Sequence, residues 1–289
     1  PESSLLMFGQ AVPGQADEFT VELSGAIVPD ADGTYEVGGL VAGAGRITVG
    51  ATALVDDPDG QLPRGDYLFG MASEEQLARI DARAGEPIPL RIVTTGRDGF
   101  AAARFGMRRV ADRPPIEAAV ELAAVADVAV VVVGTTDEWE TEGHDRDDIV
   151  LPGDQDELVR RVAAVASRTV VVVNAGGPVA MPWLADVDAV VLASFAGIET
   201  GPAVAAVLAG DADPGGRLPV TYPKQLVDTP AWPHYRPVDG AQTYGEGRLM
   251  GYRGYLAADV EPLLPSGHGL SYGTSVWGTA ALPADTVPA

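Results

Sequence analysis

Apolar and polar residues alternate along the first part of the chain. Phe19, Val21 and Leu23, for example, are each followed by a polar residue. A period of two is typical of strands that bury one face. Turn sequences such as Asp57-Pro58-Asp59-Gly60 separate these strands at short intervals. Residues 1–112 are therefore predicted to form an antiparallel sandwich or barrel.

The pattern changes at Asp112-Arg113-Pro114-Pro115, after which continuous apolar runs alternate with helical patterns. The runs lie at residues 128–133, 170–173 and 189–193. Strands that are apolar on both faces and alternate with helices are typical of a parallel sheet covered on both sides. Residues 113–233 are therefore predicted to form an α/β domain, with helices on both faces of a parallel sheet.

One helix of this domain has a recognisable start. It is predicted to run from Gln155 to about residue 167, with Asp154 as candidate N-cap. Glu157 follows the cap three residues later, which resembles a capping box. The predicted apolar stripe consists of Leu158, Val162 and Val165.

Three apolar runs are few for a doubly wound sheet. Residues 218–222 are a candidate fourth strand, and further helices are predicted at residues 116–125 and 202–208. We expect the preceding sandwich to be an insertion into an α/β domain whose first strands lie upstream of residue 1. The start of the chain has neither an initiator methionine nor a signal-peptide pattern. The chain is therefore expected to be an interior or processed piece of a longer protein.

The composition excludes several classes of function. The 289 residues include 19 Lys and Arg against 41 Asp and Glu, which gives a formal net charge of −22. Nucleic acids and anionic membrane surfaces would repel such a chain, so neither is expected as a partner. The absence of cysteine excludes disulfides, thiolate metal sites and a cysteine nucleophile. No run of about 18 apolar residues is present that could span a membrane.

The loop after the first parallel strand carries the richest chemistry of the chain. It contains Trp139, Glu140, Glu142 and the pair Asp145-Arg146. Open α/β sheets bind ligands at the carboxyl ends of their strands. A glutamate there can act as a general acid, an indole can stack on a ligand, and an Asp-Arg pair can orient it. A solvated acidic loop is the alternative.

Three further patterns resemble known sites but lack part of the required sequence. The aspartates within residues 145–154 lack the glycine and the glutamate of a calcium loop, so no metal site is expected. Gly269-Leu270-Ser271-Tyr272-Gly273 matches a nucleophile elbow but lacks a buried strand before it and a helical pattern after it. Asn174-Ala175-Gly176-Gly177-Pro178 lacks the spacing of a phosphate-binding loop. That absence argues against a nucleotide-binding protein.

Four longer motifs follow one another along the second half of the chain. They are Glu142-Gly143-His144-Asp145-Arg146 with Leu151-Pro152-Gly153, Asn174-Ala175-Gly176-Gly177-Pro178-Val179 with Met181-Pro182-Trp183, the run from Gly210 to Pro223, and Gly251-Tyr252-Arg253 with Gly267-His268-Gly269-Leu270-Ser271-Tyr272. In order and spacing they closely resemble the C-terminal α/β-sandwich domain of glycoside hydrolase family 3, the β-glucosidase family. Residues 19–110 resemble the protective-antigen-type β-sandwich that some of these enzymes carry as an insert, although Gly50-Ala51 stands where Asp-Gly is more usual.

This resemblance implies a domain organisation. Residues 1–112 would be the protective-antigen-type insert and residues 113–233 the α/β-sandwich domain. Residues 234–289 would form an extended arm and the start of a fibronectin type III-like domain. Enzymes of this family also have an N-terminal TIM barrel, which no part of this chain resembles.

The resemblance also implies a retaining exo-β-glycosidase, with β-glucosidase as the first reading and β-xylosidase or another exo-β-glycosidase as the alternative. In this family an Asp of the barrel is the nucleophile, and a Glu on a loop of the α/β domain is the acid/base. Glu142 matches that glutamate, with Glu140 as the alternative. His144 stands where the family more often has Tyr. The expected substrate-binding residues are Trp139, His144, Asp145 and Arg146.

The expected partners are a β-glucoside, either a small molecule or an oligosaccharide, and the TIM barrel that completes the site. No cofactor is implied, and a homodimer and secretion are further expectations. A non-catalytic carbohydrate-binding module, calcium-dependent through Asp56-Asp57, is the alternative from a different class of function.

Overall fold

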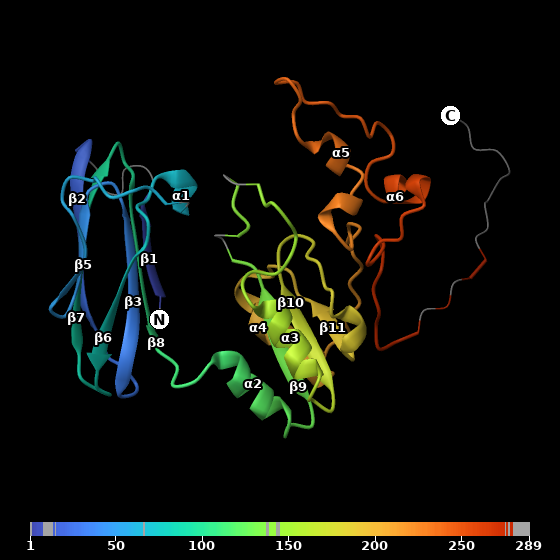
Figure 1. Cartoon of the computed structure of the whole chain (residues 1–289), viewed down its shortest axis with the longest axis horizontal. Helices are drawn as coiled ribbons and strands as arrows, with labels where there is room; N and C mark the ends of the chain where they lie inside the picture. Colours follow the sequence, from blue (N-terminus) through green and yellow to red (C-terminus); the bar gives the residue numbers. More distant parts are fainter. Residues whose placement is uncertain are drawn as a thin grey trace. The chain divides into compact units, whose positions relative to one another are not determined.

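The computed structural model describes most of the chain. The described residues are 2–7, 14, 16–65, 67–136, 139–142, 145–274, 276 and 278–279. The chain folds into two compact units, Pro1–Ala118 with Asp137–Asp145 and Ala119–Thr136 with Arg146–Ala289 (Figure 1). The domain limits predicted at residues 112 and 233, and the fibronectin type III-like assignment at the end of the chain, stay predictions.

The first unit is a β-sandwich of two antiparallel sheets, which confirms the predicted all-β fold and excludes a closed barrel. The first sheet contains, in order, β1 (Glu2–Met7), β8 (Ala101–Arg109), β3 (Gly33–Ala42) and β6 (Gln76–Ala82). The second sheet contains, in order, β2 (Glu18–Ile27), β7 (Ile88–Arg97), β4 (Gly45–Val49) and β5 (Thr52–Asp57). A short helix, α1 (Tyr67–Gly70), lies between β5 and β6 in sequence.

The core of the sandwich takes side chains from both sheets. Val37 and Val41 of β3 pack with Ile47 and Val55 of the second sheet, and none of the four has exposed surface. The predicted alternation holds in β4, where Ile47 and Val49 are buried and Arg46 is exposed, because every second residue points inward. Residues 37–42 of β3, by contrast, are all buried. On β2 the alternation is weaker, and Leu23 is exposed because β2 pairs only with β7 and forms the sheet edge.

The second unit contains a parallel sheet, as predicted. Its strands are β9 (Ala129–Gly134), β10 (Thr169–Asn174) and β11 (Ala189–Leu192), in the spatial order β11-β10-β9. The helical elements along this part of the chain are α2 (Pro115–Ala123), α3 (Gln155–Ala163), η1 (Leu184–Asp186), η2 (Gly197–Glu199), α4 (Thr200–Ala209), η3 (Leu226–Asp228), α5 (Trp232–Tyr235) and α6 (Tyr252–Ala258).

One face of this sheet is closed by helices. Val131 of β9 and Val171 of β10 lie side by side on this face and pack in one core with Val159 and Val162 of α3. Figure 1 shows α3 lying across the sheet. Trp183 is fully buried in the same core, and its indole N–H donates to Asp156 Oδ1 at 2.6 Å.

The opposite face is closed over β10 and open over β9. Val172 of β10 is 2% exposed, whereas Val132, its neighbour in register on β9, is 66% exposed. Val130 of β9 is also half-exposed. The continuous apolar run predicts burial on both faces of the strand. Among the described residues, none buries Val130 and Val132 on the second face of β9.

Helix α3 differs from its prediction at both ends. The capping box is wrong: Asp154 makes no side-chain cap bond, because its φ of −95° and ψ of 20° differ from the extended conformation of a capping residue. The helix ends at Ala163, so Val165 lies beyond it and is exposed, and Val159 takes its place in the core.

The candidate strand at residues 218–222 is also wrong. Tyr222 forms only an isolated bridge with Leu264, in which the Tyr222 N–H donates to the Leu264 carbonyl at 2.9 Å. Pro219 and Pro223 lack the N–H groups that a longer ladder needs. Helix α4, by contrast, ends as predicted at Gly210, whose φ of 81° forms a left-handed C-cap.

Candidate functional site

The acidic loop leaves the parallel sheet at its carboxyl edge. Gly134 ends β9 and lies in register with Asn174, which ends β10. Since both strands run in the same direction, the loops that follow them start at the same edge. This edge is where open α/β sheets bind ligands.

The predicted site residues differ in exposure. Glu142 and Asp145 are exposed, the Trp139 indole is 39% exposed, and Glu140 and Arg146 are half-buried. His144, together with Asp137, Glu138 and Gly143, lies outside the described residues. The loop therefore offers a carboxylate and an indole that a ligand can reach.

The predicted Asp145-Arg146 pair does not form among the described ion pairs. The Arg146 Nη2 donates instead to the Pro178 carbonyl at 3.3 Å. Its Nη1 is buried without a hydrogen-bond partner. The guanidinium thus turns toward the protein, and the structure does not bring it together with the Asp145 carboxylate.

Gln155 fixes the start of the loop, a role that the sequence patterns missed. Its Oε1 accepts the Gly134 N–H at 2.7 Å, and its Nε2 donates to the Gly134 carbonyl at 2.9 Å. The same Nε2 donates to the Pro152 carbonyl at 3.0 Å. A single amide side chain therefore satisfies both backbone groups at the end of β9. The only sequence signal was an amide residue directly after Leu151-Pro152-Gly153-Asp154.

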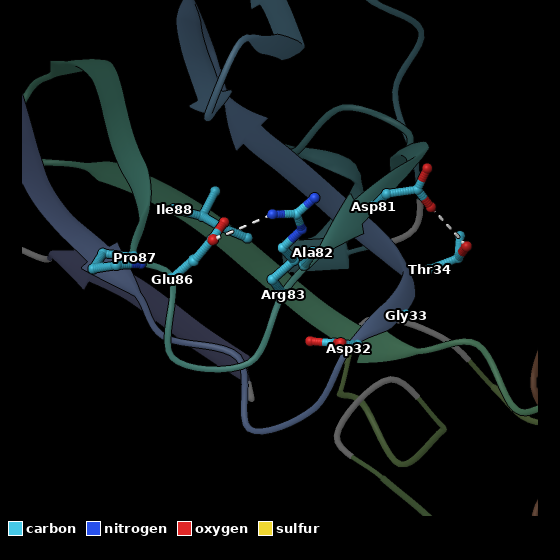
Figure 2. Close-up of a pocket in the computed structure, with 9 residues that line it drawn as sticks. All are labelled: Asp32, Gly33, Thr34, Asp81, Ala82, Arg83, Glu86, Pro87 and Ile88. Carbon is cyan, nitrogen blue, oxygen red and sulfur yellow. Dashed lines mark hydrogen bonds and ion pairs between the residues drawn. The ribbon is translucent and has the colours of Figure 1, made fainter.

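A surface hollow with a volume of about 460 Å³ lies on the sandwich. Figure 2 shows two interactions between its side chains: Thr34 Oγ1 donates to Asp81 Oδ1 at 2.8 Å, and Arg83 Nη1 lies 3.7 Å from Glu86 Oε1. Asp32 Oδ1 accepts the Ala84 N–H at 2.8 Å. This hollow contains no aromatic side chain and none of the predicted site residues.

A second hollow of about 270 Å³ lies in the second unit, between the residues before η3 and helix α6. Its lining includes Thr221 and Tyr255, and the hydroxyl oxygens of both are buried without a hydrogen-bond partner. Burial first, and then the charge of Asp228, raise the pKa of the Tyr255 phenol above its ordinary value. Because both hydroxyls are sealed from solvent, a ligand in this hollow would not reach them.

The described residues include no group of three or more His, Asp or Glu arranged to hold a metal ion. The Asp57 carboxylate, one of the two considered for calcium, accepts the N–H groups of Gln61 and Leu62 at 2.7 and 2.9 Å. Ser271, of the elbow-like motif, donates to the Gly273 carbonyl. Within the described part of the chain, no helix has the length and apolar character needed to cross a membrane.

Comparison with known proteins places most of the chain in one family. Residues 20–272 match the Glycosyl hydrolase family 3 C-terminal domain. "Probable beta-glucosidase I" of Aspergillus terreus is 39% identical over 272 residues, which cover 89% of this chain and 32% of that protein. The protein of the same description in Aspergillus niger is 38% identical over 273 residues, or 89% of this chain and 33% of that protein. The chain thus spans about a third of the length of these relatives.

Solved structures agree with this match. The beta-glucosidase from Kluyveromyces marxianus in complex with glucose superimposes with a TM-score of 0.79 at 35% identity, covering 89% of this chain and 31% of that chain. DesR, a beta-glucosidase from Streptomyces venezuelae in complex with D-glucose, gives a TM-score of 0.56 at 30% identity, covering 91% of this chain and 32% of that chain. The sandwich, the parallel sheet and the motif order thus share one explanation: the chain belongs to glycosyl hydrolase family 3 and comprises that family's C-terminal domain.

Proposed function

We propose that the full-length protein is a retaining exo-β-glycosidase of the β-glucosidase type, and that this chain supplies its general acid/base, Glu142. The observation that carries the proposal is the position of Glu142, an exposed carboxylate within Glu-Gly-His-Asp-Arg on the loop after β9. The similar proteins described above are beta-glucosidases, and two were solved with glucose.

The chemistry needs two carboxyl groups about 5–5.5 Å apart. In the first step a nucleophilic carboxylate outside residues 1–289 attacks the anomeric carbon, while protonated Glu142 gives its proton to the departing glycosidic oxygen. In the second step the Glu142 carboxylate takes a proton from water, and the resulting hydroxide displaces the enzyme carboxylate. Two inversions retain the β-configuration and return Glu142 to its protonated form.

The neighbouring residues have separate roles in this proposal. The Trp139 indole is exposed enough to stack on a sugar ring or an aglycone. Asp145 is an exposed acceptor for sugar hydroxyls, and His144 is assigned to substrate binding on its place in the motif. Glu140, which is half-buried, remains the alternative acid/base.

The test compares Glu142→Ala with Glu140→Ala in the full-length enzyme. General acid/base catalysis is worth about 10²–10⁴-fold, so Glu142→Ala should lower kcat/KM by that factor for an alkyl β-glucoside. A dinitrophenyl β-glucoside should lose far less in the first step, since its leaving group needs no proton. Azide should then restore turnover and yield β-glucosyl azide. Glu140→Ala should show neither effect.

Equal losses on both substrates would contradict the assignment of Glu142. If Glu140→Ala instead shows the leaving-group dependence and the azide rescue, the acid/base is Glu140. The ratio of kcat/KM for matched β-glucoside and β-xyloside substrates decides the sugar, and a ratio below one would favour β-xylosidase. Secretion and a homodimer complete the proposal, and fractionation of cultures and light scattering test them.

A further inference from the structure

We propose that Arg146 is a positioning residue for the acid/base loop and does not bind the sugar. It fastens the end of this loop to residues 174–180, which also hold its start. The expected effect on catalysis rests on the proposed role of Glu142, whereas the attachment of the loop through the bond from Arg146 to Pro178 does not.

Residues 174–180 hold the loop at both ends. At its start, the Thr135 N–H donates to the Asn174 carbonyl at 3.1 Å. At its end, the Arg146 Nη2 donates to the Pro178 carbonyl at 3.3 Å, and the Ala180 N–H donates to the Ile149 carbonyl at 2.7 Å. One short segment, from the last residue of β10 to Ala180, thus contacts the loop both where it leaves the sheet and where it returns.

At the start of the loop, the bond to residues 174–180 joins backbone groups, and the Gln155 side chain holds Gly134 in addition. Gly134 approaches the end of β10 so closely that a Cβ added to it would overlap the Asn174 carbonyl. The bond from Thr135 to Asn174 joins two backbone groups, and Thr135 is buried. Substitution of the Thr135 or Asn174 side chain therefore leaves this backbone bond largely intact.

The end of the loop depends on one side chain. Of the two hydrogen bonds described above between the loop end and residues 174–180, the bond between Ala180 and Ile149 joins backbone groups, and the other comes from the Arg146 guanidinium. A charged N–H binds a carbonyl more strongly than a neutral one. Arg146 is four residues from Glu142 along the chain, so its loss frees the part of the loop that follows Glu142.

The burial of the guanidinium argues against contact with a sugar. Arg146 is half-buried, its Nη2 is bound to Pro178, and its Nη1 is sealed from solvent. A sugar-binding arginine would present free N–H groups to the ligand. A general acid must lie within hydrogen-bond reach of the glycosidic oxygen, and a misplacement of about 1 Å can lower a rate about 10²-fold.

The experiment uses the full-length enzyme with Arg146→Lys and Arg146→Met. Arg168→Lys and Arg168→Met are the matched controls, because Arg168 is exposed and precedes β10 at the opposite edge of the sheet. Two readouts are needed: amide hydrogen exchange over residues 145–150, and kcat and KM separately for an alkyl and a dinitrophenyl β-glucoside.

For Arg146→Met we expect exchange over residues 145–150 to rise at least about tenfold, which reports a more frequent local opening. The kcat for the alkyl glucoside should fall about 10- to 100-fold with KM nearly unchanged, since positioning and not binding is lost. The dinitrophenyl glucoside should lose less. Arg146→Lys should recover part of both effects, and the Arg168 variants should match the wild type.

Unchanged exchange in Arg146→Met would overturn the proposal, and so would a rise in KM with unchanged kcat, which indicates sugar binding. If the methionine variant fails to fold, the same outcomes in Arg146→Lys decide. The two proposals fail separately. Suppose that hydrogen exchange rises in Arg146→Met while Glu142→Ala shows no dependence on the leaving group. The attachment of the loop by Arg146 would then be supported, and the assignment of Glu142 as acid/base would be rejected.

Discussion

In the β-sandwich, Ile47 and Val55 have no exposed surface, whereas on strand β9 of the parallel sheet Val132 exposes 66% of its surface. The sandwich brings the inner faces of two sheets together, so its alternating strands bury what their pattern requires. The parallel sheet has one buried face and an apolar second face that is open over β9. A strand of higher apolar content, such as β9 (AVVVVG) beside β4 (GRITV), is therefore not always the more buried one.

The two units also differ in how completely their buried polar side chains are hydrogen-bonded. In the sandwich, buried Ser73 accepts the Val41 N–H, and both oxygens of buried Asp57 accept backbone N–H groups. Among the described residues, the buried side-chain atoms without a partner are Arg146 Nη1, Asn174 Oδ1, Thr221 Oγ1 and Tyr255 Oη, and all four lie in the second unit. Two of these atoms belong to the carboxyl edge of the sheet, where the acid/base loop begins and ends. Within the described residues, the second unit is thus the one whose buried polar side chains are less completely hydrogen-bonded.

The largest expected effect compares two apolar truncations in the 289-residue chain. Ile47→Ala opens a cavity in the sandwich and should lower the free energy of unfolding of that unit by about 2–5 kcal/mol. Val132→Ala removes a side chain that is already 66% exposed, so its cost should stay within about 0.5 kcal/mol. Hydrogen exchange of strand amides measures each unit separately. Equal losses of unfolding free energy in Ile47→Ala and Val132→Ala would contradict the difference in burial between the sandwich and β9.

A second pair of substitutions compares two glycines in strands. Gly134→Ala places a Cβ against the Asn174 carbonyl, and the backbone shift should cost about 1–3 kcal/mol. Gly25→Ala on β2 meets no atom within 4 Å and should be neutral or slightly stabilising. Urea unfolding followed by probes in each unit checks both values. A neutral Gly134→Ala would show that the two strand ends are not held closely together.

The smallest expected effect is a gain in stability. Tyr255→Phe removes a buried hydroxyl that has no partner and should raise the free energy of unfolding by about 1 kcal/mol. Because the folded-state pKa of Tyr255 is raised above 10.0, the wild type loses stability as pH rises above that value, and the variant avoids this loss. The difference between the two should therefore widen above pH 10. Tyr244→Phe, at an 86% exposed position, is the control. A destabilising Tyr255→Phe would indicate that the hydroxyl has a partner.

The sequence patterns predicted the strands that follow from the order of apolar and polar residues within a short segment. Alternation found the sandwich strands, and the continuous valine run found β9, because side-chain direction follows directly from strand geometry. The capping box at Asp154 failed since two residue types at the right spacing do not set the backbone angles of the cap. The open face of β9 could not be predicted, because an apolar run states what should be covered and not what covers it.

The candidate site shows the same division. The loop after β9 was found from its residue types and its place after a parallel strand. The hydrogen bond between the Gln155 side chain and Gly134 joins residues 21 positions apart. The bond from Arg146 to Pro178 joins residues 32 positions apart. No short motif encodes such pairs. The predicted pair of Asp145 with Arg146 rested on adjacency alone, and the tertiary contact with Pro178 replaced it.

The most direct test of the account is the pH dependence of kcat/KM for an alkyl β-glucoside, measured on the full-length enzyme and on Glu142→Gln. The pH profile of kcat/KM for the wild type should be bell-shaped, and its alkaline limb reports loss of the proton on the general acid. Glu142→Gln should be slower and should lack this alkaline limb, while the acidic limb from the nucleophile remains. A variant that keeps both limbs with unchanged shape would contradict the claim that Glu142 is the acid/base.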